Sequence, residues 1–335
     1  MSEAMAARQL LGALLSVAFG AALASVEVPL AWMLGALAGG AMAASFSTMP
    51  PGTRGIRRAG QLLIGAAAAG ALTPDTPQQI TAMLPLMRAA ELLANMSGIL
   101  LARLARVDRT TALLASLPAG MAEMTLLAKD LGARGEVVAV VHMLRVVQVV
   151  VLVPLLVNLA PGESLTEIRA ESSIAALLVC LGGGWLVPQG ASQVGFLNPY
   201  VVAPMILGAL LVAWGIPVAP LPTAGLVLAP LLIGHELGLR LRADLLARLP
   251  RAALAGAACS LVLTLVMVQG AAPAIAALGG LAPGAVALGV APGGLGEMIA
   301  AAKSSGASVG LVAEFQILRS VLTNMVVPQV ILPRR

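Results

Sequence analysis

The chain alternates between long apolar stretches and short clusters of proline, glycine and charged residues. Most apolar stretches reach the roughly 18 to 25 residues that a helix needs to cross a hydrocarbon layer about 30 Å thick. In the first half, the pattern predicts helices at 8–25, 28–46, 57–73, 78–103 and 135–158. In the second half, it predicts them at 172–188, 198–216, 222–239, 250–271 and 307–331. The fold class predicted is therefore an all-α integral membrane protein.

Two further segments, 110–130 and 282–303, carry the same motif near their middles. LPAGMAEMTLLAKDLG starts at Leu117, and VAPGGLGEMIAAAKSSG contains the second copy of the motif, 174 residues after the first. Without gaps, 118–154 and 292–328 are identical at 15 of 37 positions. Upstream, LGAL at 34–37 recurs at 207–210, and LLIG at 62–65 recurs at 231–234. The sequence therefore predicts two copies of one unit, occupying residues 1–160 and 171–335.

The distribution of positive charge indicates how the copies are oriented. Only 10% of the residues are charged, and lysine and arginine in short loops concentrate on the cytoplasmic side of a membrane. If the two motif segments dip into the bilayer and return, the arginines at 8, 54–58, 103–109, 240–251 and 334–335 all lie inside. The acidic loop 161–171 and the uncharged loop 270–283 then lie outside. This arrangement predicts cytoplasmic termini and a bacterial inner-membrane location.

The same arrangement gives each copy five crossings and one re-entrant or broken helix hairpin. Because five is an odd number, the two copies are inverted relative to each other. Inverted repeats with interrupted helices near the midplane are the architecture of many secondary transporters. The repeated motif therefore predicts a shared central site with pseudo-twofold symmetry.

The motif itself predicts an interruption of each helix. Proline removes a backbone donor, glycine permits a close approach, and the glutamate falls in the first turn of the helix that resumes. These glutamates either bind an ion or substrate or cap the resuming helix, and both interpretations stay open. The motif residues are Pro118, Gly120 and Glu123 in the first copy, and Pro292, Gly293, Gly294 and Glu297 in the second.

Two arginines, Arg145 and Arg319, lie near the middle of predicted spans, where an unpaired cation is costly. His142 and Gln316 precede them by three residues and share their helical faces. Each arginine either pairs with the glutamate of its own copy and locks the hairpin, or binds the substrate directly. The two interpretations are compatible if the substrate displaces one pairing.

Several other polar residues distinguish the copies or argue against an enzyme. Glu91 and Asn95 share a face of the first copy's fourth span with Arg88, and the second copy has the milder Cys259, Ser260 and Thr264 there. Glu91 and Asn95 are candidates for ion or substrate selectivity, and the alternative is that Arg88 and Glu91 neutralise each other. His235 and Glu236 form a further candidate proton site. The two histidines lie far apart and the two cysteines are isolated, so neither a metal site nor a cofactor is predicted.

With both motif copies in hand, the chain resembles the AbrB family of bacterial inner-membrane proteins with a duplicated domain. The resemblance rests on residues 116–154 and 289–329 and extends through the LGAL and LLIG elements. Ala119 departs from the family's Pro-Gly-Gly. The labels ammonia monooxygenase and transcriptional regulator are used for such proteins, but the sequence has neither ligands for a metal cluster nor a nucleic-acid-binding module. The resemblance brings no catalytic residue with it.

Together these features predict a secondary transporter of a small solute, with an organic anion as the expected class and H⁺ or Na⁺ as the coupling ion. The predicted partners are the lipid bilayer and the solute or ion, without nucleic acid, and self-association into a homo-oligomer is left open. The alternative is a membrane-embedded regulator of gene expression or signalling that moves no solute. An enzyme is not predicted.

Overall fold

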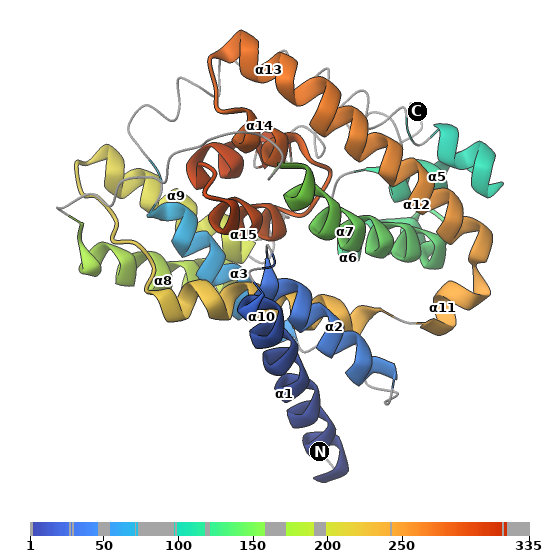
Figure 1. Cartoon of the computed structure of the whole chain (residues 1–335), viewed down its shortest axis with the longest axis horizontal. Helices are drawn as coiled ribbons and strands as arrows, with labels where there is room; N and C mark the ends of the chain where they lie inside the picture. Colours follow the sequence, from blue (N-terminus) through green and yellow to red (C-terminus); the bar gives the residue numbers. More distant parts are fainter. Residues whose placement is uncertain are drawn as a thin grey trace. The chain divides into compact units, whose positions relative to one another are not determined.

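The computed structural model of the chain describes residues 3–26, 28, 30–45, 54–70, 72, 97, 99–117, 121–157, 172–190, 199–241, 243–316 and 318–319. Apart from one bridge between Ser173 and Val218, the regular structure of these residues is helical (Figure 1). The helices are α1 (Glu3–Ser25), α2 (Ala31–Ser45), α3 (Arg54–Ala69), α5 (Arg109–Ser116), α6 (Met121–Asp130), α7 (Gly135–Val157), α8 (Ile174–Gly190), α9 (Pro199–Ala213), α10 (Thr223–Arg240), α11 (Ala243–Arg248), α12 (Pro250–Leu265), η1 (Val266–Ala271), α13 (Ala272–Gly279), α14 (Pro283–Val290) and α15 (Leu295–Ser305). Residues 99–105 and 309–316 are also helical.

Helices form where the apolar pattern predicts them. The ends of α2, α7 and α10 lie within a few residues of the predicted spans 28–46, 135–158 and 222–239. Both motif segments are interrupted as expected, because α5 and α6 occupy the first and α14 and α15 the second. Most of the predicted span 78–103 lies outside the described residues.

The predicted loop at 270–283 is wrong over its first ten residues. Helix continues without a break from Pro250 to Gly279, through the π-helical turn η1, and Gly280 then ends it in the left-handed conformation. Pro273, early in α13, has no N–H to donate and would strain a regular α-helix. The wider π turn accommodates it, since Ala272 donates to the Met267 carbonyl, five residues back.

Among the described residues, two helical stretches are both long and apolar enough to cross a membrane. They are α7 and the continuous stretch Pro250–Gly279. Shorter apolar helices occupy Gln9–Ser25, Ala31–Ser45, Ile174–Gly190 and Pro199–Ala213. Five crossings in each copy therefore stay a prediction.

The chain divides into two compact units, and each unit draws helices from both sequence repeats. The first unit contains α1–α3 and α8–α10. The second contains α5–α7 and α12–α14, together with the start of α15 as far as Met298 and residues 311–319. The compact units therefore do not coincide with the repeats, and neither repeat contains a whole unit.

In the first unit, α1 and α2 pack backbone to backbone and run antiparallel (Figure 1). A Cβ atom added to Gly35 would overlap the backbone of Gly20, and one added to Gly39 would overlap the backbone of Ser16. As the residue number rises along α2, the number of the α1 neighbour falls. Small residues at such positions let two helices approach more closely than larger side chains permit.

Helix α10 packs against α2 through the glycine of its own LLIG element. A Cβ atom on Gly234 would overlap the Met33 carbonyl, and one on Gly238 would overlap the Leu37 carbonyl. The residue numbers of the contacting pairs rise together along the two helices, so α2 and α10 run parallel. The first repeat's α2 is thus paired with the second repeat's α10.

The reciprocal pair is α3 with α9. A Cβ atom on Gly65, in the first LLIG element, would overlap the Val201 carbonyl, and one on Gly208, in the second LGAL element, would lie 2.5 Å from Ala69 Cβ. These helices also run parallel. The LGAL and LLIG elements therefore make equivalent contacts in the two copies, each with a helix of the opposite copy.

The remaining contacts of the first unit join antiparallel helices. A Cβ atom on Gly60, early in α3, would lie 2.8 Å from Ile233, late in α10. One on Gly70, after α3, would lie 3.1 Å from the carbonyl oxygen of Ala219, which precedes α10. Ser173, just before α8, exchanges backbone hydrogen bonds with Pro217 and Ala219, just after α9. Helix α3 is thus antiparallel to α10, and α8 to α9.

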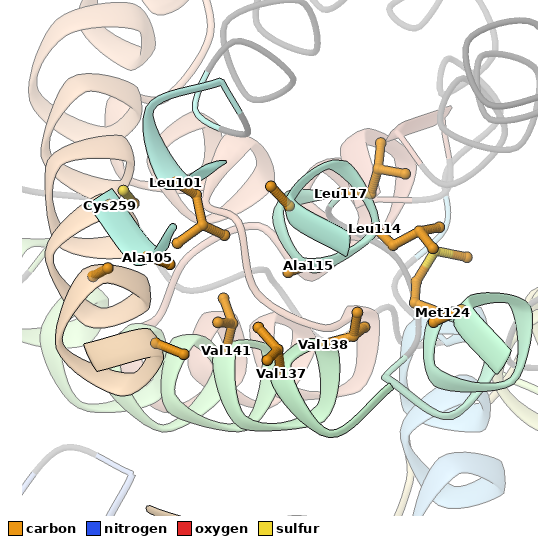
Figure 2. Close-up of a cluster of buried hydrophobic side chains, with 14 residues drawn as sticks. Leu101, Ala105, Leu114, Ala115, Leu117, Met124, Val137, Val138, Val141 and Cys259 are labelled. Carbon is orange, nitrogen blue, oxygen red and sulfur yellow. The ribbon is translucent and has the colours of Figure 1, made fainter. Parts of the chain in front are cut away.

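The core of the second unit is a cluster of buried apolar side chains around α7. Figure 2 shows Val137, Val138 and Val141 along α7, with Met124 of α6 at one end of the cluster and Cys259 of α12 at the other. Leucine and alanine side chains of α5 complete it. Because α7 contacts α5, α6 and α12, it is the helix on which the first interrupted segment is built.

Candidate functional site

The first interrupted segment, α5 and α6, folds back on itself. The Thr111 hydroxyl, at the start of α5, accepts a hydrogen bond of 2.9 Å from the backbone N–H of Arg134, which follows the end of α6. A segment that ran straight on would separate these residues by more than about 25 Å, at about 1.5 Å per helical residue. The end of the motif segment therefore lies beside its beginning.

Asp108 fixes the point where the returning segment starts. Its carboxylate accepts hydrogen bonds from the Thr111 backbone N–H at 2.8 Å and from the Thr111 hydroxyl at 2.6 Å, so Asp108 is the N-cap of α5. Burial tends to raise the pKa of the Asp108 carboxyl. The hydrogen bonds from Thr111 and the charge of Arg134 outweigh that tendency and hold the pKa below its ordinary value.

Two buried side chains of α7 brace the carboxyl-terminal end of α5. Arg145 donates from Nη1 to the carbonyl oxygens of Ser116 and Leu117, both at 3.0 Å. His142 Nε2 donates to the Leu114 carbonyl at 2.8 Å. The last carbonyls of a helix lack intrahelical partners and carry partial negative charge, so a cation and an N–H donor at this end stabilise the break. We call His142 and Arg145 the first brace.

The second interrupted segment breaks at Ala291–Gly294, between α14 and α15. Pro292 and Gly293 are buried there. Gly294 accepts the first helical bond of α15 from Met298 at 3.0 Å. The Glu297 carboxylate folds back over Gly294, where any Cβ atom would overlap it. Glu297 thus lies at the amino-terminal end of α15, as the motif predicts, and its carboxylate occupies the space beside Gly294.

Gln316 and Arg319 brace the carboxyl-terminal end of α14, and we call them the second brace. Gln316 Nε2 donates to the carbonyls of Leu288 at 3.0 Å and Gly289 at 2.9 Å, and it lies 3.3 Å from a third, that of Ala291. Arg319 donates from Nη1 to Ala291 and from Nη2 to Gly293.

The two braces are equivalent. His142 to Leu114 and Gln316 to Leu288 each span 28 residues, as do Arg145 to Leu117 and Arg319 to Ala291. These two contacts of each brace thus recur at aligned positions of the sequence repeats, whereas Arg145 also donates to Ser116 and Arg319 to Gly293.

The two breaks lie close together on α7. A Cβ atom added to Gly293 would lie 3.0 Å from Val149 Cγ1 and 2.8 Å from Met298 Cε. Val149 follows Arg145 by one helical turn, which is about 6 Å along the axis. The helix that braces the first break therefore touches the backbone of the second.

Some predicted site residues lie outside the described part of the chain. Pro118, Gly120, Glu91 and Asn95 are among them. Glu123 belongs to the first turn of α6, but its side chain is outside the described residues. The structure therefore brings together Arg145, His142, Pro292, Gly293, Gly294, Glu297, Gln316 and Arg319 in the second unit.

Sequence reasoning missed Glu314, a buried carboxylate in the helical residues 309–316 that is only 5% exposed. Its equivalent in the first copy is Val140, so no repeated motif marked it. An isolated glutamate in an otherwise apolar run, VGLVAEFQ, was the available signal.

His235 and Glu236, the other candidate proton site, lie in the first unit. Ser16 donates its hydroxyl hydrogen to the Ala36 carbonyl at 3.1 Å and lies 2.8 Å from His235 Nδ1, while Glu236 forms an ion pair with Arg240. The two contacts of Ser16 connect α1 to α2 and to α10 through polar groups. Across the described residues, no three histidine, cysteine or acidic side chains could hold a metal ion.

The sequence model of one family, described as "Transition state regulatory protein AbrB", matches residues 32–332. The chain belongs to the AbrB family. The match includes both interrupted segments and both braces, so the duplicated contacts described above lie within the part that defines the family.

One relative is the "Uncharacterized protein YhjN" of Bacillus subtilis (strain 168). It is 25% identical over 349 residues, which cover 94% of this chain and 90% of the relative. The similarity therefore extends over both repeats, and its name assigns no activity.

Proposed function

We propose that this protein is a secondary transporter of the bacterial inner membrane that carries a small solute by alternating access. The observation that carries the proposal is the convergence of two interrupted helices, equivalently braced by buried arginines, within one compact unit. Non-helical backbone at membrane depth is tolerated where it is buried in protein or lines a cavity. Broken helices of this kind form substrate and ion sites in transporters built from inverted repeats.

Exposed apolar side chains support the placement in a membrane. Leu178 of α8 and Leu254 of α12 are 63% and 74% exposed, and further leucines and valines of α1, α8 and α12 are also exposed. In water such surfaces would aggregate or bind a partner, whereas in a bilayer they contact acyl chains. With α7 and Pro250–Gly279 long enough to cross, an integral membrane protein accounts for both features.

The helix directions of the first unit support inverted repeats. Helix α2 is antiparallel to α1 and parallel to α10, and α3 is antiparallel to α10 and parallel to α9. Helix α8 is antiparallel to α9. It follows that α8, α9 and α10 run opposite to α1, α2 and α3, their counterparts in the first repeat.

Glu297 is the residue we assign to coupling. As a carboxylate, it occupies the amino-terminal end of α15, where partial positive charge favours an anion. Protonation removes its charge, and the carboxylate of an organic-anion solute then replaces it at the amino-terminal end of α15. Solute and proton would therefore bind together and cross together.

Reconstituted vesicles test the proposal. The purified chain is placed in liposomes that enclose a pH-sensitive dye, dicarboxylates and amino acids are added outside one at a time, and protein-free vesicles give the baseline. We expect at least one solute to change the lumenal pH, Glu297→Gln to abolish the change, and Glu136→Gln to keep it, because Glu136 is exposed. A folded wild-type protein that changes the lumenal pH with none of these solutes would refute proton-coupled transport of dicarboxylates and amino acids. Unchanged coupling in Glu297→Gln would remove this carboxylate from the mechanism.

The words "regulatory protein" in the description of the matched family favour a second candidate, a membrane-embedded regulator that moves no solute. It predicts no solute-dependent ion movement in the vesicles. Its binding surface would be the short basic segment 240–251, so replacing the arginines there should abolish the regulatory effect while Glu297→Gln leaves it intact.

A further inference from the structure

The two braces differ in one respect that bears on proton binding. The first contains a histidine, His142, at the position where the second contains Gln316. Both side chains donate to the equivalent carbonyl, but histidine changes its charge near neutral pH and glutamine does not. The first interrupted helix is therefore held by a group that can bind a proton, and the second is not.

The contacts of His142 fix its protonation state. Its Nε2 lies 2.8 Å from the Leu114 carbonyl oxygen, which can only accept, so Nε2 carries a hydrogen. Its Nδ1 lies 3.1 Å from Arg145 Nη2, which can only donate, so Nδ1 carries none. Both neighbours thus require neutral imidazole, and His142 is fully buried.

A second proton would disrupt this brace. It would have to sit on Nδ1, where it would oppose an Arg145 N–H and place two positive charges about 3 Å apart. In the second brace, Arg319 donates from both Nη1 and Nη2 to backbone carbonyls. In the first brace, Arg145 Nη2 lies against the titratable His142.

Other titratable groups on the helices that contact α7 lie mostly at the surface. Glu136, Arg109, Lys129 and Asp130 are exposed, and α14 contains no titratable residue. Arg251 donates to the Leu104 carbonyl, and Cys259 lies in the apolar cluster. Elsewhere in the second unit, Glu297 and Glu314 can titrate, and the side chain of Glu123 lies outside the described residues.

We propose that His142 is a proton-binding site whose occupancy releases the first interrupted helix. The braced state excludes the proton, the released state binds it, and acidification therefore shifts the population toward release. The inference rests on the proposed transport function in one respect. In the transport cycle, proton binding at His142 makes the proton the coupling ion. Release moves only the first break, which gives the two breaks the asymmetry that alternating access needs.

Amide exchange tests the switch without any substrate. The Leu117 N–H donates to Leu113, and its counterpart, the Ala291 N–H, donates to Ala287, so peptides covering the two amides report on the two breaks in one sample. Dividing the protection factor of the Leu117 amide by that of the Ala291 amide removes the effect of pH on intrinsic exchange. An accessible histidine titrates at about pH 6.5, so lowering the pH to about 5.5 should reduce the ratio about tenfold.

Two exchanged variants provide the controls. In His142→Gln, which copies the second brace, the ratio should become independent of pH. In Gln316→His, a protonated imidazole has two N–H donors for the carbonyls of Leu288 and Gly289, so acidification should not release the second break. Both variants should keep the wild-type helix content at about pH 7.5, where an accessible histidine is mostly neutral. Gln316→His should melt below wild type, because one N–H replaces the two that reach Leu288 and Gly289.

The outcomes separate this inference from transport itself. A wild-type ratio that does not change with pH, or a pH dependence that survives in His142→Gln, would refute the switch, and in the second case another titratable group would be responsible. Coupled uptake in vesicles with a pH-independent ratio would refute the switch and keep the transporter. A pH-dependent ratio without uptake of any solute would keep the switch and refute the transporter.

Discussion

Replacing Arg145 with methionine tests the brace directly. Arg145 is only 4% exposed, and its guanidinium donates to two carbonyls and to His142. A hydrogen bond to a charged group contributes about 1.5–3 kcal/mol, so two orphaned carbonyls suggest a gross loss of about 3–6 kcal/mol. Burying the guanidinium also has a cost, which methionine avoids. We therefore expect a net loss of about 3 kcal/mol in the free energy of unfolding.

Reversible unfolding by sodium dodecyl sulfate in mixed micelles measures this loss. At about 1.4 kcal/mol for each factor of ten, the folded-to-unfolded ratio of Arg145→Met should fall about a hundredfold. The stability of Arg145→Lys should lie between those of wild type and Arg145→Met, because an ammonium keeps the charge but cannot reproduce the forked donors of a guanidinium. Arg319→Met should resemble Arg145→Met, since the braces are equivalent. The exposed Arg103→Met is the control and should remain within about 0.5 kcal/mol of wild type.

A loss below about 0.5 kcal/mol in Arg145→Met, the range of ordinary surface substitutions, would refute the brace. It would mean that the carbonyls of Ser116 and Leu117 find other donors, so that the arginine is available for another role. A large loss in Arg145→Met with none in Arg319→Met would instead refute the equivalence of the two copies.

Three further changes have outcomes that follow from single contacts. Asp108→Ala removes the N-cap of α5 and should lower the free energy of unfolding by about 1 kcal/mol. Because the pKa of Asp108 is held below its ordinary value, this difference from wild type should persist at neutral pH and shrink below about pH 4. Denaturant titrations at several pH values measure it. Gly35→Ala should lower the melting temperature sharply, since its Cβ would overlap the α1 backbone, whereas Gly55→Ala, with nothing within 4 Å, should not. Gly293→Ala should cost about 1–3 kcal/mol in the same micelle assay, because Val149 and Met298 must move.

Much of the fold could be predicted because its signals are local. Apolar runs located α2, α7 and α10, and the repeated proline and glycine located both interruptions. The extra helix up to Gly279 escaped prediction, because nothing in the sequence distinguishes a π turn before Pro273 from the end of a helix.

The pairing of the repeats could not be predicted. LGAL and LLIG identify glycines, but a glycine does not say which helix approaches it. That α2 pairs with α10, and α3 with α9, depends on contacts between residues more than 130 positions apart. Glu314 escaped for a related reason, since its burial follows from how residues 309–316 pack, and its counterpart Val140 carries no charge.

The arginines show where reasoning from single residues stops. The sequence left two roles open for Arg145 and Arg319, pairing with a glutamate or binding the substrate. The structure adds a third role, which is to donate hydrogen bonds to backbone carbonyls at the ends of α5 and α14. An interrupted helix has a negative end and a positive end, and the arginines neutralise the negative one. A solute anion is therefore better matched to the start of α15, where Glu297 now lies, so exchange between that carboxylate and the solute, rather than arginine binding, becomes the step on which transport depends.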